Sequence, residues 1–244
     1  MGMLLNSFGT FGDTPLPGAS GIDADTVLML KMNGADASTT FTDSSDSAHT
    51  MTAVGSAQID TAQSKFDGAS GLFGGSGDYL STAISADFAF ASGDFCIDAQ
   101  VRLSTFGAYH IIIGCGYTSN WMWQLQTDGN LKLWIAGGSG LTFIHGMTTD
   151  AWHHICVARL SGVIYGYVDG VYKASNSYAS SIGGSLALYV GNDPQVSGAY
   201  AGHIDELRVS KGAARIDDSA DLLYCGGTPT NGFTPPSKPY TDER

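Results

Sequence analysis

The chain has 244 residues, of which 43% are hydrophobic and only 14% are charged, and its formal net charge at pH 7 is -12. So few charged residues cannot cover the wet faces of several long amphipathic helices, which excludes a mainly helical protein. A surface this acidic repels phosphate backbones, so we expect no nucleic acid partner. The same charge suits calcium, neutral sugars or a basic protein surface, and it also serves solubility alone.

Residues 1–24 do not have the pattern of a domain core. The apolar residues between Met1 and Phe11 recur without a period, and Pro15 and Pro17 interrupt any regular element. We expect either a disordered leader or an arm that orders against a partner. The segment has no basic region followed by a long apolar stretch, and no apolar run reaches membrane-spanning length. We therefore expect synthesis in a cytosol and no membrane insertion.

Short apolar or alternating runs follow along the chain, separated by turn residues every 8 to 12 positions or so. The strand candidates are 26–32, 49–54, 56–59, 72–80, 95–103, 109–115, 121–125, 131–135, 141–145, 152–160, 163–168, 171–174, 185–190 and 202–209. The pattern predicts an all-β fold, a two-sheet antiparallel jelly-roll sandwich over residues 25–215. Residues 216–244, rich in proline, are expected to form a C-terminal tail.

The four cysteines are far apart and match no metal-binding spacing. Cys96 and Cys156 lie in apolar strand candidates, which favours buried free thiols. A disulfide between Cys115 and Cys225 is the alternative.

A family resemblance rests on four segments that occur in the family's order. They are Phe66 to Leu80 with its glycine-rich strand pair, Trp152-His-His-Ile-Cys-Val-Ala-Arg159, the hairpin Gly166-Tyr-Val-Asp-Gly-Val171 and Gly202-His-Ile-Asp-Glu-Leu-Arg-Val209. Together they resemble the laminin-G-like, concanavalin A-like lectin and glucanase superfamily in its single-domain form. With Ser210 to Arg215 after the last segment, the chain looks most like such domains in tailed-phage virion proteins. The superfamily includes lectins, hydrolases and structural modules, so the fold leaves the function open.

Catalysis is not expected. Members of the superfamily that cut β-glucans use two glutamates of one strand, and retaining hydrolysis needs two carboxyls about 5 Å apart. Here Glu206 is the only glutamate in a strand candidate, and its neighbour Asp205 should point to the opposite face. The adjacent His153 and His154 should likewise face opposite sides and cannot both bind one metal.

The resemblance implies a structural calcium near the last strand, where Asp205 is the aspartate of the family's Ile-Asp-Glu motif. Asp43 would lie close to it if the first and last strands pair. Calcium needs six to eight oxygen ligands, so carbonyl groups of glycine-rich turns would complete the shell. The alternative is that Asp205 only accepts hydrogen bonds from the backbone or from Arg208.

A carbohydrate site is the second binding hypothesis. Sugar rings stack on Trp and Tyr, and amides bind the hydroxyls. Trp121 and Trp123 share one face of a strand candidate, Trp134 lies on the next strand, and Tyr117 and Asn120 belong to the adjoining loop. The alternative is that these rings belong to the core.

The sequence therefore predicts a non-catalytic phage virion protein, structural, decorative or part of a fibre. It would be made in the host cytoplasm, form a homo-oligomer, attach to capsid or tail proteins through the N-terminal arm and bind a host-surface glycan. A free-standing bacterial carbohydrate-binding module is the alternative, and a glycoside hydrolase is a distant third.

Overall fold

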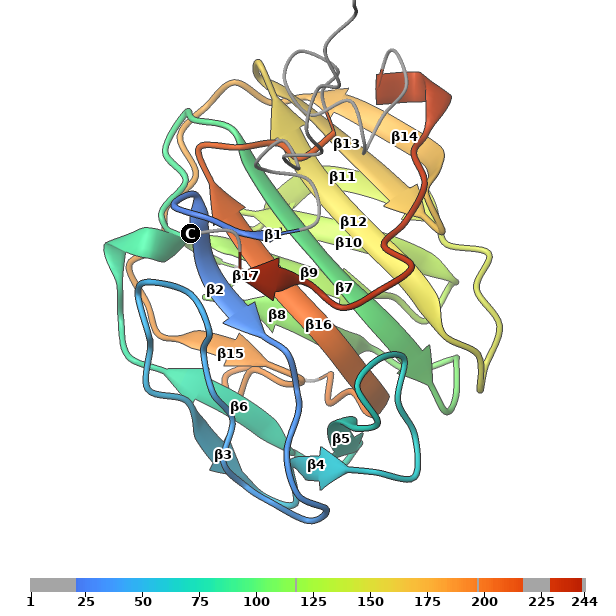
Figure 1. Cartoon of the computed structure of the whole chain (residues 1–244). Coiled ribbons are helices and arrows are strands. Elements are labelled where there is room, and N and C mark those ends of the chain that lie inside the picture. The colour runs from blue at the N-terminus through green and yellow to red at the C-terminus, as the bar shows by residue number, and fades with distance from the viewer. Residues whose placement is uncertain (1–20, 117, 197, 217–228, 243–244) are drawn as a thin grey trace, which may run out of the picture.

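Two antiparallel sheets packed face to face form the body of the protein (Figure 1). The computed structural model describes residues 21–116, 118–196, 198–216 and 229–242. In these ranges there is no α-helix, and only two short 3₁₀ turns occur, η1 (Ala86–Phe88) and η2 (Pro229–Asn231). The predicted all-β jelly-roll sandwich is confirmed. No helix in the described ranges has the length and apolar character needed to cross a bilayer.

The two sheets differ in size and in strand order. In spatial order, the seven-stranded sheet consists of β11 (Gly138–Ile144), β10 (Asn130–Ile135), β9 (Trp121–Leu125), β8 (His110–Gly114), β15 (Leu188–Val190), β6 (Tyr79–Thr82) and β3 (Thr52–Val54). The eight-stranded sheet consists of β14 (Val171–Ser177), β13 (Val163–Val168), β12 (His153–Leu160), β7 (Phe95–Leu103), β16 (Ala201–Lys211), β5 (Ser70–Gly74) and β4 (Gln58–Asp60), with β2 (Thr26–Leu30) also paired to β16. In both sheets a late strand, β15 or β16, lies between strands from the first half of the chain.

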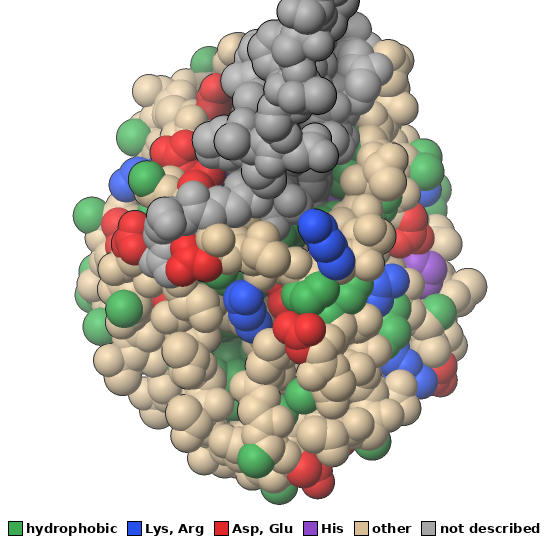
Figure 2. All heavy atoms as spheres, viewed as in Figure 1, with side chains coloured by type: hydrophobic (Ala, Val, Ile, Leu, Met, Phe, Trp, Pro, Cys, Tyr) green, Lys and Arg blue, Asp and Glu red, His purple; other side chains and the backbone are tan. Residues whose placement is uncertain are grey.

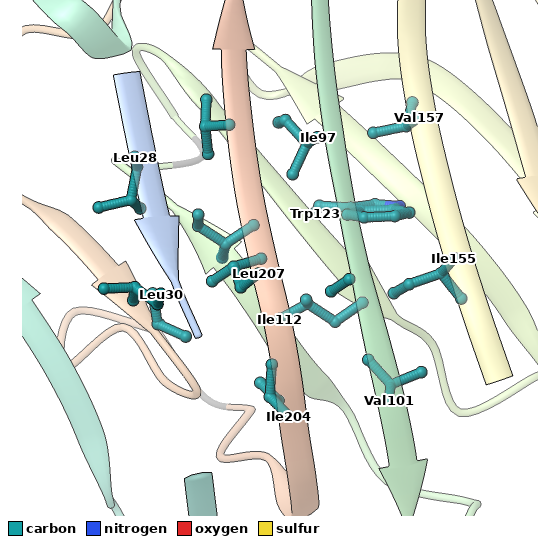
Figure 3. Close-up of a cluster of buried hydrophobic side chains, with 14 of the residues drawn as sticks. Leu28, Leu30, Ile97, Val101, Ile112, Trp123, Ile155, Val157, Ile204 and Leu207 are labelled. Carbon is teal, nitrogen blue, oxygen red and sulfur yellow. The ribbon is translucent and has the colours of Figure 1, made fainter. Parts of the chain in front are cut away.

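The core lies between the inner faces of the two sheets. The alternation predicted for residues 95–103 holds, because all five odd-numbered residues of β7, from Phe95 to Leu103, belong to the main buried cluster. Figure 3 shows the Trp123 ring among Ile97, Ile155 and Val157 of the opposite sheet. Burying apolar surface contributes about 25 cal/mol per Å², so this layer holds the two sheets together.

The outer face of the eight-stranded sheet is covered by segments from both ends of the described chain. Residues 229–242, part of the expected tail, run over this face in Figure 1. The Phe233 ring packs on Tyr167 with 5.0 Å between ring centroids, and Tyr240 is buried with Ile22 and Met29. Strands β1 (Gly21–Ile22) and β17 (Thr241–Asp242) pair in parallel. Residues 229–242 are thus packed on the sandwich.

Most of the visible surface is polar and uncharged. Figure 2 shows the acidic and basic side chains scattered over this face without a continuous apolar patch. Beneath it, Cys96 and Cys156 are buried free thiols with their Sγ atoms 3.6 Å apart. Cys115 is also a buried free thiol, and burial raises its pKa to about 12. Cys225, its partner in the alternative disulfide, lies outside the described residues.

Candidate functional site

Two of the tryptophans expected to bind sugar lie in the core. Trp121 and Trp123 are 1% and 0% exposed, and the Trp121 indole N–H donates to the Phe88 carbonyl at 2.8 Å. They share one face of β9, as expected, but this face points inward. Rings enclosed in this way cannot stack on a sugar, so their assignment to a carbohydrate surface was wrong.

In the loop before β9, the Asn120 side chain makes its hydrogen bonds within the protein. The Asn120 side-chain N–H donates to the Cys115 carbonyl at 2.9 Å, and its oxygen accepts from the backbone and side chain of Ser185. Asn120 is 2% exposed, so its amide shapes the loop and is not offered to a ligand. Tyr117 lies outside the described residues.

Trp134 is the predicted aromatic residue that reaches the surface. It pairs with Met122 across β9 and β10 and therefore lies on the outer face of the seven-stranded sheet, half-buried. Its indole N–H donates to the Gln124 side-chain oxygen at 3.2 Å, and the Lys132 ammonium lies 3.3 Å from the ring centroid. Lys132 thus covers one face of the ring through a cation–π contact.

A second surface lies where the loops after β5, β7, β9 and β15 meet. They border an open, shallow hollow of about 490 Å³, called the rim hollow below, to which Ser76, Tyr109, Thr127 and Asn192 each contribute from a different loop. The Tyr109 side chain is 44% exposed and is the only aromatic among the described lining residues. Asn192 is 9% exposed, and none of the hydrogen bonds found among the described residues involves its side-chain amide. The rim hollow thus combines the accessible Tyr109 ring with polar side chains that can hydrogen-bond to a ligand.

Gly198 joins the rim hollow to the sheet. Its backbone carbonyl accepts a hydrogen bond from the Ile111 N–H at 2.7 Å. This bond holds the loop after β15 against strand β8 of the seven-stranded sheet. A Cβ atom at Gly198 would lie 2.9 Å from the side-chain nitrogen of Gln124, and φ is +148°, so glycine is required here. Since Gln124 also bonds Trp134, the rim hollow and Trp134 share one side of the molecule.

The two aspartates expected to bind calcium organise different segments. Asp43 Oδ1 accepts from the Met29 and Ser45 N–H groups, each at 2.9 Å, and Oδ2 lies 2.8 Å from His49 Nδ1. Asp205 Oδ2 accepts from the Lys65 and Phe66 N–H groups at 2.9 and 3.0 Å. The first and last long strands, β2 and β16, do pair.

The two carboxylates accept hydrogen bonds from different segments, and Asp205 Oδ1 is buried without a hydrogen-bond partner among the described residues. A calcium ion needs six to eight converging oxygens. Among the residues that the structure describes, no group of three or more His, Cys, Asp or Glu side chains could hold a metal ion.

A bulge in β16 changes the expected geometry of Asp205 and Glu206. The pairing with β7 shifts between Asp205 and Arg208, and Glu206 has a φ of 49°. Strict alternation therefore fails, and both carboxyls are buried. Burial raises the pKa of Asp205 to about 7 and that of Glu206 to about 8. Both groups lie under other segments, the Lys65–Phe66 backbone and Tyr240, so they do not face substrate in a cleft.

The fold and its sequence pattern together define the class of protein. The model of the concanavalin A-like lectin/glucanases superfamily matches residues 73–217, and the chain belongs to this superfamily. Among curated proteins, no match to the chain was found.

Solved structures with the same fold include binding domains of larger proteins. The binding domain of Paraclostridial Mosquitocidal Protein 1 has a TM-score of 0.62 and 15% identity, and the match covers 82% of this chain and 51% of that one. The ligand binding domain of botulinum neurotoxin serotype D, solved in complex with N-acetylneuraminic acid, has a TM-score of 0.60 and 15% identity, with 78% and 48% covered. The chain thus spans about half the length of these toxin domains.

A third similar structure is matched over nearly its whole length. It is domain 4 of AbnA, a GH43 extracellular arabinanase from Geobacillus stearothermophilus, in complex with arabinotriose. The TM-score is 0.59 at 18% identity, and the match covers 78% of this chain and 94% of that one. At these identities the likeness establishes the fold alone.

Proposed function

We propose that the chain is a non-catalytic carbohydrate-binding domain and that it binds its glycan at the rim hollow. The observation that carries the proposal is the exposed Tyr109 ring, which shares the hollow with the uncommitted Asn192 amide. An aromatic ring provides a stacking surface for the apolar face of a sugar, and an amide both donates to and accepts from hydroxyls. The solved complexes of this fold with arabinotriose and N-acetylneuraminic acid support a binding role.

The arrangement of the carboxyls supports the absence of catalysis. Glycoside hydrolysis needs two carboxyls that flank the scissile bond. Asp205 and Glu206 instead each bind a different covering segment, through the Lys65 N–H and the Tyr240 N–H respectively. The rim hollow itself has no carboxyl group among its described lining residues.

The site is tested by Tyr109→Ala and Asn192→Ala in the full chain. After a glycan array has supplied a ligand, each variant is expected to weaken its binding by about fivefold or more, since one stacking or hydrogen-bonding contact is worth about 1 kcal/mol or more. Isothermal titration calorimetry measures the loss. Ile144→Ala, which alters a side chain that is 74% exposed outside the hollow, is the matched control and should bind normally.

Trp134→Ala separates the two surfaces of this side of the molecule. If Trp134→Ala abolishes binding and Tyr109→Ala leaves it unchanged, the glycan lies on the outer face of the seven-stranded sheet and the rim-hollow assignment is wrong. Circular dichroism of each variant shows whether the fold is retained.

We further propose that the domain is displayed on a phage virion as a structural, decoration or fibre protein, and that it is a homo-oligomer. Residues 1–24 would attach it to a capsid or tail protein. Strand β1 pairs with Thr241 and Asp242, which holds Gly21 and Ile22, next to the proposed attachment segment, on the sandwich. A free-standing bacterial carbohydrate-binding module is the alternative.

The virion proposal is tested by deleting residues 1–20. This deletion keeps β1 and the contact between Asp23 and Arg215, whose Nη1 lies 2.7 Å from Asp23 Oδ2, so the sandwich should stay folded. We expect the shortened protein to keep its glycan binding and to be missing from purified particles, as judged by immunoblotting. Normal incorporation would contradict the attachment role of the arm.

A further inference from the structure

We propose that the rim hollow selects uncharged saccharides and rejects anionic ones such as sialylated sugars and uronic acids. This inference rests on the proposed carbohydrate-binding function and adds the chemical class of the ligand. It is carried by two features of the structure, the uncharged lining of the hollow and the aspartates that adjoin lining residues in three of its loops.

The lining offers no cation to an anionic sugar. Among the described residues that line the rim hollow, none is Lys, Arg, His, Asp or Glu. A sugar carboxylate that enters the hollow would lose part of its hydration, and proteins usually offset this loss with a guanidinium or ammonium group. Lys132, on the strand next to Thr127, holds its ammonium 3.3 Å from the Trp134 ring centroid.

Three of the four loops carry an aspartate next to a lining residue. Asp78 follows Gly77, Asp128 follows Thr127 and Asp193 follows Asn192. No aspartate or glutamate occurs in the fourth loop, residues 104–109.

Hydrogen bonds within the loops fix these aspartates in place. The Asp78 oxygens accept from the Ser56 and Gly74 N–H groups, both at 2.7 Å. Asp128 Oδ1 accepts from the Asn130 N–H at 3.1 Å, and Asp193 Oδ1 from the Gln195 N–H at 2.9 Å. These bonds hold the three carboxyl groups in defined positions beside the lining residues that precede them in the chain.

Asp128, which follows Thr127 of the lining, carries a negative charge at neutral pH. Hydrogen bonds from the Asn130 side chain and backbone lower its pKa, so it is ionised throughout the neutral range. Burial raises the pKa of Asp193, which makes its charge the more pH-dependent of the two. An acidic group beside a binding surface weakens the binding of an anionic sugar, because bringing two negative charges together costs free energy.

Recognition of a neutral sugar needs only the groups that the lining presents. The Asn192 amide and the hydroxyls of Ser76 and Thr127 can each both donate and accept, as a sugar hydroxyl does. Tyr109 adds the stacking surface. The ligand that fits this combination is an uncharged oligosaccharide.

The test compares neutral and acidic sugars of matched structure by calorimetry on the full chain. The probes are galactotriose against trigalacturonate, and lactose against 3′-sialyllactose, with arabinotriose as a further neutral probe. We expect neutral members to bind at least about tenfold more tightly than their acidic counterparts at low salt, with a smaller ratio at about 0.5 M salt, because salt screens the repulsion.

Charge variants connect this preference to the hollow. Asp128→Asn keeps a side-chain oxygen for the Asn130 N–H and removes one negative charge, and Thr127→Lys adds a cation to the lining itself. Asp128→Asn should reduce the ratio of the affinity for neutral sugars to the affinity for acidic sugars. Thr127→Lys should reverse the preference, so that acidic sugars bind more tightly. Val171→Lys adds the same charge at an exposed position on β14 outside the hollow and should leave the ratio unchanged.

The outcomes separate this inference from the proposed function. Equal or tighter binding of the acidic members by the unaltered protein overturns the neutral preference and leaves carbohydrate binding intact. The same preference in Thr127→Lys shows that the discrimination arises elsewhere and overturns its assignment to the hollow. If no probe and no glycan on an array binds, the proposed function fails, and the inference fails with it.

Discussion

Arg208→Met is expected to lower the free energy of unfolding by about 3–5 kcal/mol, the range for breaking a buried ion pair from one side. Arg208 Nε lies 3.0 Å from Asp98 Oδ1, and both side chains are 0% exposed. Burial by itself would raise the pKa of Asp98, yet the charge of Arg208 and the hydrogen bond from His154 hold it at about 2. Without Arg208 this carboxylate would remain buried and poorly compensated. Urea denaturation measures the loss.

The same substitution at an ion pair whose carboxylate is exposed provides the control. Arg102 Nη1 lies 3.1 Å from Asp150 Oδ1, and the Asp150 side chain is 62% exposed. Exposed pairs are worth about 0–1 kcal/mol, so Arg102→Met should have little effect. Equal losses in Arg208→Met and Arg102→Met would contradict the special role of the buried pair.

The protein is expected to lose stability as the pH rises from about 6.5 to 8.5, by roughly 2 kcal/mol. Burial raises the pKa of Asp205 to about 7 and that of Glu206 to about 8. The folded protein therefore keeps protons that the unfolded chain has released, so the stabilisation is full at low pH and is lost as the pH passes through 7 and 8. Melting temperatures measured across this window test the expectation.

Other titrating groups modify this pH dependence. Burial lowers the pKa of His110 and His145, so the unfolded chain binds more protons at these groups up to about pH 7.5, and they partly oppose the trend in the lower half of the window. The lowered pKa of Asp98 makes the protein lose stability in strong acid. Glu206→Gln removes one titrating group and keeps an acceptor for the Tyr240 N–H, so its pH dependence should be flatter. A melting temperature that rises from pH 6.5 to 8.5 in the unaltered protein would contradict the account.

The sandwich could be predicted from the sequence because the alternation of inward and outward residues depends only on neighbouring positions of one strand. In β7 the inward and outward residues alternate without exception, as the sequence indicates. In β9 every residue is buried, so periodicity could not tell which face carries the core. The outer face of β9 is covered by Gly198 and the loop after β15, which lies more than 60 positions later in the chain. The Trp121 and Trp123 assignment failed for this tertiary reason.

The candidate site could not be read from the sequence. Its polar groups come from four loops, and neither Tyr109 nor Asn192 belongs to a motif. The bulge that buries both Asp205 and Glu206 depends on a positive φ at Glu206, which strand alternation does not predict. Proline content indicated a tail after residue 216, whereas Phe233 and Tyr240 anchor residues 229–242 through contacts with β13 and β16.

The central claim, that a glycan binds at the rim hollow, is tested most directly by an NMR titration of the isotope-labelled full chain with a neutral trisaccharide that binds. The account predicts that the largest shift changes occur at Tyr109, Thr127 and Asn192, with smaller changes at Gln124 beneath Gly198. Shift changes confined to the surface around Trp134 and Lys132, or to the segment 229–242, would contradict it.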